Sequence, residues 1–278
     1  LFKGTAQQLD KILFTNLFSI GYLGFYERGL SILNLPKSFV GSSLDGILFT
    51  IFSVNKNSIS NLQKLYIRSI TIVSFIMFFI GVTTWLNSEA IILLLFGSKW
   101  DTTGEILGIV AIGLLLFPYW RFVDTLIRAT NNFGYATIIQ VIKFITLIIF
   151  CSVGYSYYDV SGALYGIVLN EFIYTTLSII LANYILGMNI RNFLLSQFCT
   201  LRYLILLILI HVISSYVISD QVILLFTCIF LSLLTSAFFL YFKPSFYGIE
   251  NVAYLLKLLN TSKLSKVKMF SDKIESRF

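Results

Sequence analysis

The chain has few charged residues and almost no histidine or cysteine for its length. Of its 278 residues 12% are charged, against about 25% in a typical soluble domain, which excludes a soluble single-core domain and a disordered chain. The cysteines Cys151, Cys199 and Cys228 form no pair pattern, so a disulfide-stapled miniprotein is excluded as well. His211 is the single histidine and no Cys/His cluster is present. We therefore predict no metal site and no cofactor.

Two further absences narrow the function and the boundaries of the chain. No glycine-rich phosphate loop of the Walker type is present, so the sequence encodes no ATPase. The chain starts at Leu1 without a basic stretch, a short apolar region and a cleavage site. We therefore expect the sequence to begin inside a longer gene product.

Long apolar runs are what the sequence has in abundance. Hydrophobic residues make up 57% of the chain, or about 158 residues. Eight transmembrane helices of about 20 residues each need about 160. The runs are unbroken, whereas the strands of a membrane barrel alternate apolar and polar residues. We predict an all-α, polytopic membrane helical bundle with about eight transmembrane helices.

The apolar runs place eight spans along the chain. We expect Pro36 to bend or start the second span and Pro118 to kink the fourth. The apolar piece 91–96 is too short to span and is expected to lie at the interface, and the turn 131–134 ends the fourth span. The predicted spans are 8–25, 30–52, 69–86, 105–127, 135–153, 162–186, 203–217 and 222–242.

Lysine and arginine are distributed unequally between the two sides of these spans. With the N-terminus inside, fifteen lie on inner loops and ends, and only Arg28, Lys37 and Lys99 lie outside. Arg121 and Lys143 fall within spans and count for neither side. This is a strong positive-inside pattern, which predicts a multi-pass protein with both ends of the chain in the cytoplasm. It also explains the net charge of +7 without a nucleic-acid partner.

Aromatic residues form 17% of the chain and are common near the predicted span ends. Such positions favour an interfacial aromatic belt over ligand stacking. His211, among leucine and isoleucine, is interpreted as a neutral, hydrogen-bonded histidine rather than a proton relay. The predicted belt comprises Tyr22, Tyr26, Trp85, Trp100, Tyr119, Trp120, Tyr155, Tyr157 and Tyr158.

The stretch 1–190 carries short motifs in a definite order. They are QLDK at 8–11, GYLGFYERG at 21–29, NLP at 34–36, LFTIFS at 48–53, LLFGSKW at 94–100 and RATN at 128–131. This pattern resembles the second half of a bacterial polysaccharide flippase of the Wzx type. That group belongs to the multidrug/oligosaccharidyl-lipid/polysaccharide (MOP) exporter superfamily. The chain departs from the family pattern at Gly29, where Ala is usual, at Thr50, where Pro is usual, and by the extra Phe96.

The resemblance implies a fold of fourteen spans, in two six-helix lobes plus two further helices. Residues 1–190 would be the six-helix C-terminal lobe of a MATE/MOP-like fold, 191–242 the two additional transmembrane helices, and 243–278 a basic cytoplasmic tail. The missing N-terminal lobe of the same protein would be a partner. The implied function is translocation of lipid-linked oligosaccharide by alternating access in the bacterial inner membrane, for O-antigen or exopolysaccharide export. Membrane lipids and a coupling proton or sodium ion are the other expected partners.

Two alternatives stay open. A multidrug or other small-molecule exporter of the same superfamily would favour a cavity rich in acids and aromatics. A membrane polymerase or glycosyltransferase is the more remote alternative, because the longest outer loop, 87–103, is too small for a substrate domain. A transporter breaks no covalent bond, so we do not expect an enzyme.

Ionisable residues within the spans are the candidates for substrate and ion binding, because charges inside a bilayer are costly. From the rise of an α-helix per residue, Arg121 and Lys143 lie at similar depth near mid-membrane, and Asp45 and Glu171 fall near the same level. Lys143 has no acid within one turn on its own helix, so we expect a partner across helices, either Glu171 or Asp124. That pair is either fixed or exchangeable on binding of cation or substrate.

Arg121, Asp124 and Arg128 are spaced i, i+3 and i+7, which places them on one helix face. This face is either a self-neutralised strip or a cationic wall that attracts the pyrophosphate of a lipid-linked sugar. For Arg128 we favour snorkelling to the interface. Asp45 lies in a patch of small residues typical of helix packing, and Asp45 and Glu171 are the candidate sites for a coupling cation.

Overall fold

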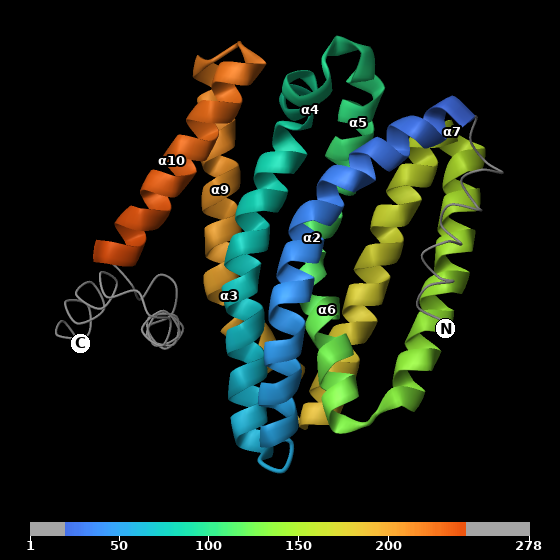
Figure 1. Ribbon diagram of the computed structural model, residues 1–278, viewed down its shortest axis with the longest axis vertical. Helices are drawn as coiled ribbons and strands as arrows, with labels where there is room; N and C mark the ends of the chain where they lie inside the picture. The colour runs from blue at the N-terminus through green and yellow to red at the C-terminus, as the bar shows by residue number, and fades with distance from the viewer. Residues whose placement is uncertain (1–19, 243–278) are drawn as a thin grey trace.

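The computed structural model describes residues 20–242, and the regular elements in this range are helices (Figure 1). Five of these helices are long and apolar enough to cross a membrane, or six if α5 and α6 form one bent span. The predicted all-α, multi-pass membrane class is therefore confirmed. In chain order the elements are α2 (Ile20–Asn55), α3 (Ile59–Leu86), α4 (Ser88–Phe96), the 3₁₀ helix η1 (Ser98–Trp100), α5 (Asp101–Val110), α6 (Ile112–Thr130), α7 (Phe133–Leu186), α8 (Ile190–Ser196), α9 (Phe198–Val217) and α10 (Gln221–Phe242).

Helix α2 corrects the prediction at the start of the chain. It runs over 36 residues with Pro36 inside it, so the predicted loop between the first and second spans is absent at 26–29. Pro36 removes one backbone hydrogen bond but does not start or end the helix; α2 bends along its length instead (Figure 1). Most of the first predicted span, and the basic tail beyond 242, lie outside the described residues.

The fourth predicted span is broken, but not at Pro118. Helices α5 and α6 meet at an angle of 46°, with Ala111 between them and Pro118 inside α6. Helix α5 packs closely on α4 beside the break. A Cβ on Gly104 would lie 3.1 Å from the Cα of Glu89, so the two helices are in close contact there. Helix α4 itself has nine residues and is too short to span, as predicted for 91–96.

Helix α7 is a hairpin of two limbs, as predicted for the fifth and sixth spans. Its backbone leaves helical geometry at Tyr158 and Asp159, where Asp159 has a φ of 50°. The limbs approach so closely that a Cβ on Gly162 would overlap the backbone carbonyl group of Gly154. Because α7 reverses, its two limbs count as two membrane spans, although α7 is one helix in the count above.

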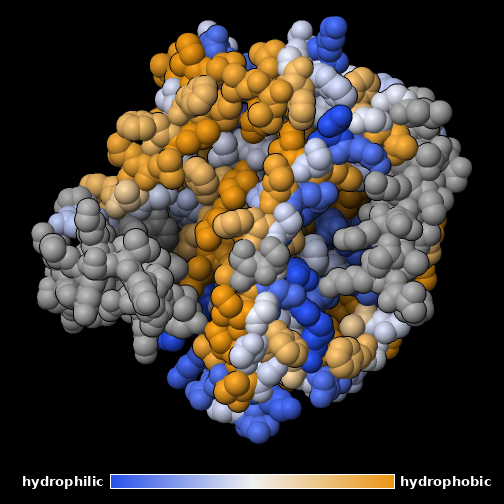
Figure 2. All heavy atoms as spheres, viewed as in Figure 1, coloured by the Kyte–Doolittle hydropathy of each residue, from blue (hydrophilic) through white to orange (hydrophobic). Residues whose placement is uncertain are grey.

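Helix α6 lies at the centre of the bundle and contacts α2, α3 and α7. Helices α9 and α10 form a second hairpin, which packs α9 on α3 and α10 on α4. Large apolar side chains cover the outer faces of α7, α9 and α10. Figure 2 shows the apolar surface in the region of α9 and α10 at the upper left, and it shows hydrophilic residues gathered at the lower end. The core consists of buried apolar side chains that include Tyr66, Ile70, Met77, Leu107, Leu114 and Leu126.

Candidate functional site

The first group of charges lies between α2 and α6 and centres on Asp45. Arg121 Nη2 is 3.2 Å from Asp45 Oδ2, and Arg128 Nη2 is 2.5 Å from Oδ1 of the same carboxylate. Thr125 donates a further hydrogen bond to Oδ1 at 2.6 Å. One carboxylate thus joins two arginines of α6 to α2. A charge-assisted hydrogen bond to Asp45 joins Arg128 to α2. Its side chain is 38% exposed near the end of α6, so its interpretation as an interface residue stays a prediction.

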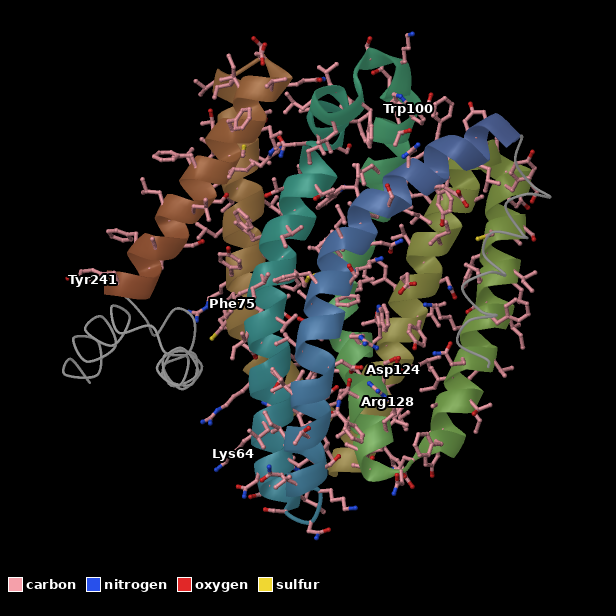
Figure 3. The ribbon with its side chains drawn as sticks, in the orientation of Figure 1. Lys64, Phe75, Trp100, Asp124, Arg128 and Tyr241 are labelled. Carbon is pink, nitrogen blue, oxygen red and sulfur yellow. The ribbon has the colours of Figure 1, made fainter. Side chains whose placement is uncertain are left out.

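Asp124 and Gly41 complete the surroundings of Arg121. Asp124 Oδ2 lies 4.0 Å from Arg121 Nη1, one helical turn along α6. On α2 the guanidinium packs against Gly41, where a Cβ would lie 3.4 Å from Arg121 Nε. Gly41, in the small-residue patch before Asp45, therefore makes room for the arginine as well as for helix packing. Figure 3 shows Asp124 and Arg128 on the same stretch of α6, between α2 and α7.

The second group of charges joins the two limbs of α7. Lys143 Nζ on the first limb is 2.9 Å from Glu171 Oε1 on the second, so Glu171 is the partner that the sequence required. The ammonium also lies 4.2 Å from the ring centre of Tyr174 and 5.3 Å from that of Trp120. Gln140 donates a hydrogen bond to the Tyr174 hydroxyl at 3.1 Å. Lys143 is therefore held by one carboxylate and two aromatic faces.

The α7 hairpin brings these side chains together. Thr146 on the first limb donates a hydrogen bond of 2.6 Å to Asn170 Oδ1 on the second, next to Glu171. The glycine contact at the closed end of the hairpin sets the spacing of the limbs. The sequence signal was present, since Gly162 and Gly166 form a G-x-x-x-G pair, a pattern that permits close helix approach.

An aromatic contact connects the two groups of charges. The rings of Trp120 and Tyr174 lie 5.6 Å apart, and Trp120 directly precedes Arg121 in α6. The side chains of the six charged residues are between 13% and 38% exposed, so they lie at an open face of the bundle and not in its sealed core. Figure 2 shows a hydrophilic strip in the hollow between α2 and α7. We call this set the central charge site: Asp45, Arg121, Asp124, Arg128, Lys143 and Glu171.

The central charge site is electrically balanced. Its three cations face three carboxylates, and each cation lies within 4.0 Å of a carboxylate oxygen. In this structure the cations of the site are paired, and both interpretations of the α6 face, the self-neutralised strip and the cationic wall, stay predictions. Two atoms of the site can still form hydrogen bonds, because Glu171 Oε2 and Trp120 Nε1 are buried without a hydrogen-bond partner. The site can accept or donate hydrogen bonds to a ligand there.

Two aromatic residues were assigned wrongly from the sequence, and one of them belongs to the site. Tyr119 and Trp120 were placed in an interfacial belt, but both lie within α6, where Tyr119 is buried against Phe193. The predicted span 105–127 already placed both residues well inside a helix, so the sequence held the signal. His211 lies outside the site, with Nδ1 3.4 Å from Asn87 Nδ2 and from Cys228 Sγ, as expected of a hydrogen-bonded histidine.

Comparison with known proteins adds two findings. Residues 1–105 match a family model described as "Polysaccharide biosynthesis protein". The fold matches that of the lipid II flippase MurJ in its inward closed conformation, with a TM-score of 0.65 and 17% sequence identity. This match covers 84% of the chain and 51% of MurJ, so the chain spans about half the length of that structure. No curated protein matches the sequence. The first finding agrees with the resemblance in residues 1–105, and the second shows that the helical bundle has the same fold as about half of MurJ.

Proposed function

We propose that this chain is the C-terminal half of a flippase that moves lipid-linked oligosaccharide across a bacterial cytoplasmic membrane during cell-surface polysaccharide biosynthesis. The observation that carries the proposal is the central charge site: six charged side chains held within the membrane-spanning part of the bundle. Intramembrane charges are costly and mark substrate or ion pathways. The family match and the flippase fold support the proposal.

The proposed organisation follows the packing of the helices. Residues 1–190 form one six-helix lobe, which works against an N-terminal lobe of the same protein. Residues 191–242 supply the two added helices, whose hairpin packs on α3 and α4 at the edge of the bundle. Residues 243–278 form a cytoplasmic tail, and both ends of the chain lie in the cytoplasm. The two lobes rock about the site between them while the lipid tail stays in the bilayer.

The balanced charges suggest how substrate and ion compete. A pyrophosphate group needs the guanidinium forks of Arg121 and Arg128 and the ammonium of Lys143. Asp45 and Glu171 hold those cations in this structure. A proton or sodium ion on either carboxylate releases the cations to the phosphates, and loss of the ion favours release of the substrate. This exchange would couple transport to a cation gradient, and it makes or breaks no covalent bond of the transported molecule, so the protein is not an enzyme.

A second candidate function rests on the aromatic part of the site. The faces of Trp120 and Tyr174 already hold one ammonium group. Aromatic faces also bind organic cations, which are substrates that a multidrug exporter of the same superfamily would carry. If the second candidate is right, replacing Trp120 and Tyr174 by leucine abolishes transport of an organic cation by the full-length protein.

The test of the first candidate is a flipping assay with full-length protein in vesicles and a defined lipid-linked oligosaccharide. Arg121→Ala and Lys143→Ala should each lose flipping while still reaching the membrane. Lys99→Ala is the matched control, because Lys99 is an exposed cation in η1, outside the helices that form the site. This variant should flip the substrate at the wild-type rate. Normal flipping by both site variants would contradict the proposal.

A charge exchange separates substrate binding from mere support of the fold. In the double variant Lys143→Glu with Glu171→Lys the ion pair can form with its polarity reversed. If the pair only joins the limbs of α7, the exchange restores both stability and flipping. We expect it to restore stability without flipping, because the ammonium then leaves the faces of Trp120 and Tyr174.

A further inference from the structure

A basic groove lies at the end of the α2–α3 hairpin, away from the central charge site. It has a volume of about 390 Å³, and no acidic residue is among the described residues that line it. Ile51 and Asn55 line it from α2, and Asn61, Lys64, Leu65 and Arg68 line it from α3. The groove is therefore a concave site with two cations, two amide side chains and an apolar floor.

The spacing of the polar residues on α3 places them in one row along the groove. Lys64 and Arg68 are four residues apart, so their side chains leave the same helix face about 6 Å from each other. Lys64 is exposed, whereas Arg68 is half-buried. Two cations at this spacing can bind the oxygens of one phosphate group, Arg68 through its planar fork and Lys64 as a point charge.

The same face of α3 becomes apolar towards the middle of the membrane. Ile72 and Ile76 follow Arg68 by one and two turns, and Ile76 is 46% exposed. Lys64 extends from α3 on the side away from Asp124 and Arg128 (Figure 3). The groove thus opens on the outer surface of the bundle, with charge at its end and an apolar surface above it. This matches a molecule with an anionic head and an acyl chain.

The position of the groove along the bundle also suits a molecule with an anionic head group and an acyl chain. It lies at the end of the bundle where Lys56 and Arg191 are also placed, beyond the apolar part of the helices. Head groups of the adjacent leaflet lie at this level, and each cation there strengthens binding of anionic lipid.

We propose that this groove binds the phosphate head group of an anionic phospholipid of the bilayer, with Lys64 and Arg68 on the phosphate and the acyl chains along Ile72 and Ile76. The site is distinct from the central charge site and does not depend on which substrate the protein carries.

The test measures binding of phosphatidylglycerol to the full-length protein in a neutral detergent, by native mass spectrometry. Phosphatidylcholine is the zwitterionic comparison, and the wild type should prefer phosphatidylglycerol by about tenfold or more. Lys64→Gln and Arg68→Gln should each weaken phosphatidylglycerol binding about fivefold. Lys99→Gln makes the same charge change at the opposite end of the bundle and should leave binding within about twofold of the wild type.

Each result decides the proposal. Equal binding of the two lipids, or equal loss in Lys64→Gln and Lys99→Gln, overturns it. Displacement of phosphatidylglycerol by an equal concentration of inorganic phosphate also overturns it, because the groove would then recognise phosphate without the lipid. Since Lys64 is exposed, its variant alone decides the matter if the Arg68 variant fails to fold. Flipping activity is not the readout, so failure here leaves the proposed function standing.

Discussion

The α7 hairpin offers the sharpest test of how the bundle holds its charges. Its limbs meet backbone to backbone, so that a Cβ on Gly162 would lie 2.6 Å from the carbonyl carbon of Gly154 and 2.9 Å from the Cβ of Tyr158. Ordinary van der Waals contact begins at 3.4 Å, so Gly162→Ala must push the limbs apart locally. The hydrogen bonds that cross the hairpin, among them those from Thr146 and Lys143, depend on this spacing.

The expected magnitude follows from two opposing effects. Alanine in place of glycine within a helix normally stabilises by about 0.5–1 kcal/mol, because glycine loses more backbone freedom on folding. Forcing an extra methyl group into a tightly packed contact costs about 1–3 kcal/mol. Because the obstructing group at Gly162 is a backbone carbonyl, which cannot rotate away, we expect the cost to exceed the gain. Gly162→Ala should therefore lower the free energy of unfolding by about 1–2 kcal/mol.

The assay is thermal unfolding of the purified full-length protein in detergent, followed by tryptophan fluorescence. Gly134→Ala is the matched control, because it lies in the same helix and its new Cβ would meet nothing within 4 Å. The control should unfold at the wild-type temperature or slightly above it, and Gly162→Ala several degrees below. If Gly162→Ala is as stable as Gly134→Ala, the limbs do not touch as described and the reasoning fails.

Three further predictions use the same unfolding assay. Asp45→Asn should lower the free energy of unfolding by about 1–3 kcal/mol, because two arginines lose their shared carboxylate. Asp124→Asn should cost less, because the contact of Asp124 with Arg121 is longer, at 4.0 Å. The reverse order of the two variants would contradict the assigned pairing. Asn131 has a left-handed backbone with a φ of 60°. Asn131→Gly should therefore leave the free energy of unfolding unchanged or raise it, and Asn131→Val should lower it by about 1–2 kcal/mol. Equal effects of the two variants would refute the left-handed turn. Asp220 accepts hydrogen bonds from the first backbone amides of α10. Asp220→Ala should therefore lower the free energy of unfolding by about 1 kcal/mol, while Asp220→Asn keeps most of the stability. An equal loss in both variants would exclude capping.

Helix ends were harder to predict than spans, for a physical reason. Hydropathy marks the part of a helix that lies in lipid, and a helix does not have to end there. Helix α3 starts at Ile59, well before the span predicted from residue 69, because Asn61, Lys64 and Arg68 continue the helix beyond the apolar part. The same holds for α2, since Arg28 was placed in an outer loop between two spans but lies within the helix. The turn at Asn131 was predictable because its left-handed backbone suits asparagine.

The composition and order of residues determined the membrane class, the positions of most spans and the expected level of the charges within the spans. The constant rise of an α-helix turns distance along the chain into depth, so Lys143 and Glu171 had to lie at similar levels. Only the tertiary structure decided which charges meet and on which side they face. Pairing depends on how each helix is rotated about its axis and on how closely its neighbours approach, and one carboxylate, Asp45, joins two arginines because α2 crosses α6 at that point. The balance of charge in the site is thus a property of the packed helices rather than of the sequence of any one of them.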